Sequence, residues 1–156
     1  MKFVFTAQEV RQIVIAAAVL SVAFALAYSN GIFGIKLAAF PYLVLFSFIA
    51  VGIGFLCHEL IGHKLIAQRN GLHAEFRMWP VGLALALLSS LAGFVFAAPG
   101  AVYVSPRIDM WGQPAAVNKR RMGIVSIAGP LVNIVLAAVF FALNMISPRE
   151  SLTSSH

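Results

Sequence analysis

The sequence predicts an all-α membrane protein with three transmembrane helices and a re-entrant helix or short β element between the second and third. Two observations support this fold class. The composition is 61% hydrophobic and only 10% charged, with a mean hydropathy of +0.93. Several apolar runs also reach the roughly 20 residues that a bilayer-spanning helix needs. With 156 residues, the chain has room for a single membrane-embedded domain, 1–156.

Local signals place the three predicted spans. Thr6 is followed three residues later by Glu9, a capping-box pattern that marks a helix start. Pro41 is a favoured first-turn residue, and Gly71 suits the position just after a helix end. The predicted spans are about 13–29, 41–67 and 122–146.

The apolar segment 81–104 has a mixed character. Its first part is rich in Leu and Ala, whereas "GFVFAAPGAVYV" is β-branched and aromatic with Gly and Pro, which favours strand or loop. If the segment crosses the membrane, Lys and Arg divide six against five between the two sides; if it returns, they divide nine against two. Because cationic loops concentrate on one side, the second split favours a re-entrant segment. We therefore expect a cell-membrane protein with segment 64–121 on the cytoplasmic side.

The net charge of +6 is carried mainly by residues that flank the apolar runs. Such residues set the orientation in the bilayer and contact anionic lipid headgroups. No solvated basic domain accompanies them, so the lipid bilayer is an expected partner and nucleic acid is not.

The stretch "CHELIGHK" (57–64) places His58, Glu59 and His63 in apolar surroundings. Ionisable residues inside a membrane indicate a functional site. The pattern is one residue longer than HExxH, in which both histidines face one metal ion. Five residues turn an α-helix by about 500°, which leaves the two histidines about 140° apart. A metal site therefore requires a π-bulge, which Gly62 would ease. The alternative is a metal-free pair, with His58 in the bundle and His63 at the interface.

"HELIGHK" followed by "AGPLVNIVLA" resembles the site-2 protease family of intramembrane zinc metalloproteases, and "AEFRMWP" and "GFVFAAPGAVYV" are similar to its archaeal members. The resemblance implies that Zn²⁺ is held by His58 and His63, with Glu59 as general base. Asn133 of the GPxxN motif would orient substrate or an oxyanion. The implied substrate is a membrane-spanning helix. The two motif helices should be antiparallel, with re-entrant or β structure between them.

Two features depart from that family. The histidine spacing is instead similar to that of the dipeptidyl peptidase III family, whose HExxxH motif binds zinc. The third zinc ligand of site-2 proteases is an aspartate in a DG motif after GPxxN, and no such motif follows Asn133 here. Asp109 and Glu75 are the candidate substitutes. The alternative function is therefore a non-catalytic membrane protein that binds metal or membrane helices, and a metal transporter ranks third.

Overall fold

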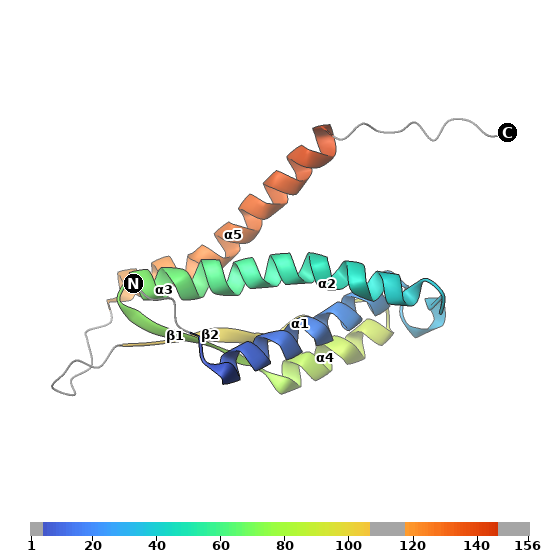
Figure 1. Ribbon diagram of the computed structural model, residues 1–156, viewed down its shortest axis with the longest axis horizontal. Helices are drawn as coiled ribbons and strands as arrows, with labels where there is room; N and C mark the ends of the chain where they lie inside the picture. Colours follow the sequence, from blue (N-terminus) through green and yellow to red (C-terminus); the bar gives the residue numbers. More distant parts are fainter. Residues whose placement is uncertain (1–4, 107–117, 147–156) are drawn as a thin grey trace.

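The computed structural model describes residues 5–106 and 118–146, which are mostly helical (Figure 1). In chain order, the elements described are α1 (Ala7–Tyr28), the short 3₁₀ helix η1 (Ile32–Gly34), α2 (Phe40–Leu56), the π-helix η2 (Cys57–Leu65), α3 (Ile66–Arg69), β1 (Leu72–Met78), α4 (Pro80–Leu91), β2 (Gly100–Pro106) and α5 (Lys119–Ile146).

Among the described residues, three helices are long and apolar enough to cross a membrane. They are α1, the continuous helix Phe40–Arg69 formed by α2, η2 and α3, and α5. Each includes one predicted span almost completely, so the three predicted helices are confirmed. The first helix begins at the predicted cap, six residues before its predicted span, where the Thr6 hydroxyl accepts a hydrogen bond from the Glu9 backbone N–H at 3.1 Å.

The sheet formed by β1 and β2 is the short β element expected between the second and third spans, and it takes the described part of the chain out of the all-α class. The strands are antiparallel, from Leu72 opposite Pro106 to Met78 opposite Gly100. After α4, the chain therefore runs back along β1, and the end of β2 lies beside the start of β1. α4 has 12 residues, so at 1.5 Å per residue it is about 18 Å long, too short for a bilayer core of about 30 Å. Segment 81–104 thus contains both a helix and a strand, which agrees with its mixed sequence character.

Side chains of α1 cover the outer edge of β1. The Glu9 carboxylate accepts a hydrogen bond from the Phe76 N–H at 2.8 Å, and the Gln12 amide oxygen accepts one from the Met78 N–H at 2.9 Å. Residues three apart share one side of an α-helix, so Glu9 and Gln12 can follow the strand together. An unpaired strand N–H away from water costs several kcal/mol, and this cover removes that cost on the α1 side.

The main core lies where α1 packs between the sheet, α4 and α2. Small residues of α1 allow close approach of the neighbouring elements, as in other membrane helix contacts. The ring of Phe76 is fully buried and meets Phe55 of α2 edge to face, with ring centroids 5.4 Å apart. The buried cluster consists of Ile13, Ala16, Leu20, Ala23, Phe76, Leu83 and Ala86.

α5 crosses η2 at two glycines. A Cβ on Gly62 would lie 2.5 Å from the Cα of Gly129, so no larger residue fits there without moving the α5 backbone. α5 starts at the end of the molecule where η2 and α3 finish, and runs back in the opposite direction before it diverges (Figure 1). The expected antiparallel arrangement of the two motif helices is therefore present.

Arg69 and Ser105 should face the same compartment, because the β1–β2 pairing brings the chain back to its starting end. In a Cys57→Ser background, Arg69→Cys and Ser105→Cys should react with a membrane-impermeant thiol reagent from one side of intact cells or vesicles. Lys36→Cys, beyond α1 in the chain, should react from the other side. Labelling of positions 69 and 105 from opposite sides would contradict the re-entrant arrangement.

Candidate metal centre

The π-helix η2 brings the two histidines of the motif together. Each π-turn closes an i→i+5 hydrogen bond, so residues five apart lie on the same face. The Nε2 atoms of His58 and His63 are 3.2 Å apart, and the rings are nearly perpendicular, at 84°. The predicted departure from α-helical geometry is confirmed, and it extends over nine residues rather than a single turn.

α5 fixes the orientation of His63. The His63 Nδ1–H donates to the backbone carbonyl of Val125 at 2.8 Å. Because a carbonyl only accepts, the proton is on Nδ1 and the Nε2 lone pair points toward His58, which is the usual tautomer of a metal-binding histidine. Gly129 leaves room for both rings, because a Cβ there would lie 2.3 Å from His63 Nε2 and 2.9 Å from His58 Cε1.

The pair fits a zinc ion. Two ligands at about 2.0–2.1 Å in a tetrahedral arrangement are about 3.3 Å apart, and the two Nε2 atoms are 3.2 Å apart. The same distance suits a hydrogen bond between the rings, which a bound ion would replace. The chemistry of the donors agrees as well, because neutral imidazole nitrogens are common zinc ligands.

Glu59 lies next to this pair and is anchored by the sheet. Its side chain is 7% exposed, and its carboxylate accepts a hydrogen bond from the backbone N–H of Val102 on β2. The Oε2 atom is buried and has no hydrogen-bond partner among the described residues. One part of the carboxylate is thus held in place, while Oε2 is available to accept a proton.

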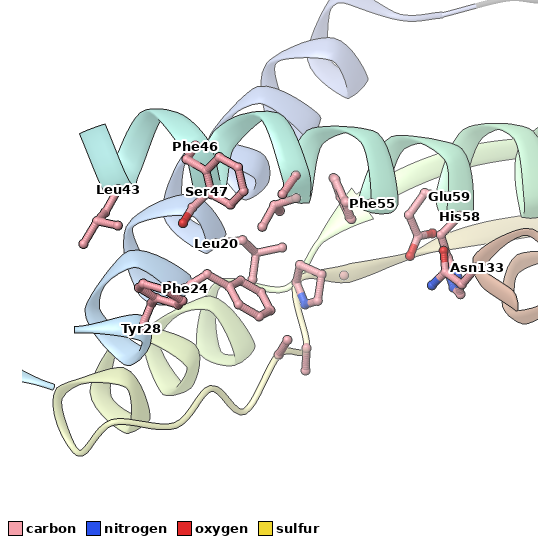
Figure 2. Close-up of a pocket in the computed structure, with 17 residues that line it drawn as sticks. Leu20, Phe24, Tyr28, Leu43, Phe46, Ser47, Phe55, His58, Glu59 and Asn133 are labelled. Carbon is pink, nitrogen blue, oxygen red and sulfur yellow. The ribbon is translucent and has the colours of Figure 1, made fainter. Parts of the chain in front are cut away.

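A cavity of about 760 Å³ ends at this site. One face of α2, from Leu43 to Phe55, forms one wall of the cavity, and α1 and residues 97–100 form other walls. Figure 2 shows His58, Glu59 and Asn133 together at one end and Leu43 and Tyr28 at the other. The rest of the lining is almost entirely apolar: Leu20, Phe24, Phe46, Ser47, Ala50, Val51, Gly54, Phe55, Ala97, Ala98, Pro99 and Gly100. Asn133 therefore joins the predicted site from α5.

The candidate third ligands are placed differently. Glu75 lies on β1, where its carboxylate accepts a hydrogen bond from the Thr6 hydroxyl at 3.2 Å and pairs with Arg77. Asp109 lies outside the described residues. Within 5–106 and 118–146, no three His, Cys, Asp or Glu side chains are grouped closely enough to hold a metal ion. Glu75 therefore does not complete the histidine pair.

Sequence reasoning missed the ion pair behind the site. Lys64, which directly follows His63, is 0% exposed and pairs with Glu9 of α1, which is 1% exposed. The charge count treated Lys64 as an interfacial cation. A signal was available, since Lys64 falls inside the helix that carries the motif and Glu9 is the only acidic residue of α1.

Comparison with known proteins supports the same chemistry. The chain is 38% identical over 152 residues to a protein of Methanocaldococcus jannaschii named "Putative zinc metalloprotease"; the match covers 96% of this chain and 69% of that protein. No protein-family model matches the sequence, and no solved structure matches it. From the extent of this similarity, we conclude that the chain belongs to the metalloprotease family of its Methanocaldococcus relative.

Proposed function

We propose that the protein is a zinc metalloprotease of the site-2 type, which cleaves membrane-spanning peptide segments within the bilayer. One observation carries the proposal. Two histidine Nε2 atoms 3.2 Å apart lie beside a buried carboxylate oxygen without a partner, at the end of an apolar cavity. The name of the relative supports the zinc and the peptidase activity. The apolar helices that carry the site support cleavage at membrane depth.

His58 and His63 would hold the zinc, which when bound supplies Lewis-acid activation of water and of a peptide carbonyl. Glu59 acts as general base: its Oε2 accepts the proton of the attacking water while the Val102 N–H holds the carboxylate. Glu59 can then return that proton to the leaving amine. The Asn133 side chain, at the same end of the cavity, donates hydrogen bonds that orient the substrate or stabilise the developing oxyanion.

The apolar part of the cavity would bind the substrate next to the scissile bond. From Leu43 to His58 is about 22 Å along the helix, which equals about seven residues of extended chain. A membrane-spanning helix that unwinds locally would supply apolar side chains for the cavity and an exposed peptide bond for the site. We place the protein in the cell membrane with segment 64–121 on the cytoplasmic side, as the charge distribution favours.

Zinc should depend on both histidines. Protein purified in detergent should contain about one zinc ion per chain, and His58→Ala or His63→Ala should remove most of it. Elemental analysis measures this, with His73→Ala as the control because His73 is exposed on β1. Asp109→Asn, assayed alongside, tests the remaining candidate ligand. Equal zinc in wild type and in both histidine variants would contradict the site.

Glu59→Gln should separate binding from catalysis. The variant keeps the shape of the side chain but cannot take a proton, so cleavage should fall by at least about 100-fold while zinc content stays unchanged. Mass spectrometry of products from a panel of model membrane-spanning peptides is the measurement. Zinc binding without cleavage by the wild type, in every peptide tested, would instead favour the non-catalytic function.

Two glycines of α2 test the cavity as the substrate site. No described atom outside the local helix backbone lies within 4 Å of a Cβ built on Gly52 or Gly54, but only Gly54 lines the cavity. Gly54→Leu should therefore reduce cleavage on the order of tenfold or more by misplacing the substrate. Gly52→Leu, with the same gain in helix propensity, should cleave like the wild type. Zinc content should be equal in both, and equal cleavage by the two variants would rule out this cavity.

A further inference from the structure

The Lys64–Glu9 ion pair is the most deeply buried charge pair that the described residues contain. Lys64 of η2 is 0% exposed and Glu9 of α1 is 1% exposed. The ammonium also lies 4.0 Å from the centre of the Phe5 ring. A buried ion pair is a costly way to join two helices, since a well-packed apolar pair is often as stable. Lys64 directly follows His63, so the ion pair is placed where it can influence the geometry of the histidine pair.

The pair is one link in a closed ring of polar contacts that begins and ends on η2. Lys64 binds Glu9, and Glu9 also accepts the Phe76 N–H of β1 at 2.8 Å. Phe76 is directly opposite Val102 in the sheet. The Val102 N–H, in turn, bonds to Glu59. Glu59 and Lys64 of the π-helix are thus both tied to a single rung of the sheet.

This ring requires the π-helical register. Glu59 and Lys64 are five residues apart, as are His58 and His63. In a regular α-helix, residues five apart point about 140° away from each other, so Glu59 and Lys64 could not both reach the rung. In the π-helix they lie on one face, and the same register brings the histidines to 3.2 Å. Whatever holds Glu59 and Lys64 on one face therefore also holds the two histidines together.

We propose that Glu9 and Lys64 are positioning residues, which lock η2 in the π-helical register and so preorganise the His58–His63 pair for zinc. The inference rests on the proposed function, because zinc is its readout. It extends that function to α1, a helix that contributes neither a ligand nor the base. The anchor acts through Phe76 and the sheet, which hold Glu9 in place opposite η2.

The double variant Glu9→Gln/Lys64→Met tests the lock. It leaves no unpaired buried charge, and the Gln side chain can still accept the Phe76 N–H. Zinc affinity, measured by competition with a chelator in detergent, should fall by at least about tenfold, as for other residues that support metal ligands. The absorption spectrum of bound Co²⁺ should change with the ligand geometry. The matched control is Gln12→Met, which removes the bond to the Met78 N–H of β1 without touching η2; its zinc affinity should stay close to that of the wild type.

Deletion of Ile61 supplies a second, independent test. Ile61 is 50% exposed, so its loss opens no core cavity, and the deletion places the histidines four apart in regular α-helical spacing. The deletion variant should bind zinc. In that background Glu9→Gln/Lys64→Met should cost little zinc affinity, because a regular helix already aligns the histidines and needs no lock. If the double variant alone fails to fold, zinc binding by the same double variant in the Ile61-deletion background would still support the proposal.

Two results would overturn the inference. One is a folded double variant, judged by circular dichroism, that binds zinc as tightly as the wild type. The other is an equal loss of affinity, or equal unfolding, with and without Ile61, which would show that the pair only stabilises the fold. A wild-type protein that binds no zinc would overturn the proposed function itself, and elemental analysis of the wild type establishes this before any variant is compared.

Discussion

The five-residue spacing of His58 and His63 imposes the constraint on which the site depends. An α-helix would separate them by about 140°, so the chain must leave α-helical geometry there to use both at one point. It does so over the whole of η2, and contacts on each side fit that register. On the α5 side, Gly62 and Gly129 meet and Val125 binds His63. On the sheet side, Glu59 and Lys64 are tied to adjacent strands.

The second constraint is that polar groups away from water need partners inside the protein. A two-stranded sheet has two edges, and here each edge meets a helix that carries acids or amides. Glu9 and Gln12 accept N–H groups of β1, and Glu59 accepts one of β2. The sheet is consequently more than a connector. It holds the carboxylate of the proposed general base and, through Glu9, the lysine that follows the second histidine.

Features that depend on neighbours in sequence could be predicted from the sequence, and the distribution of charges indicated that the chain returns. The individual contacts that this return creates could not be predicted. The Thr6 cap and the π-distortion between His58 and His63 are local geometry, and both are present. The Lys64–Glu9 pair joins residues 55 apart, and no local pattern specifies that separation. Counting Lys64 as interfacial did not change the predicted orientation, since eight cations against two still favours the same side. The α4–β2 segment gave a mixed signal because it contains both a helix and a strand.

The two halves of α5 serve the site in different ways. Before the crossing, Val125 and Gly129 are buried against η2 and fix the histidine rings. Pro130 lies just after the crossing and lacks the N–H that would bond to residue 126, which weakens the helix at that point. Beyond it, α5 diverges from η2 (Figure 1), and Asn133 reaches the cavity from the diverging part. The proposed zinc ligands and the proposed substrate-orienting amide thus contact α5 on opposite sides of Pro130, although only three residues lie between Gly129 and Asn133.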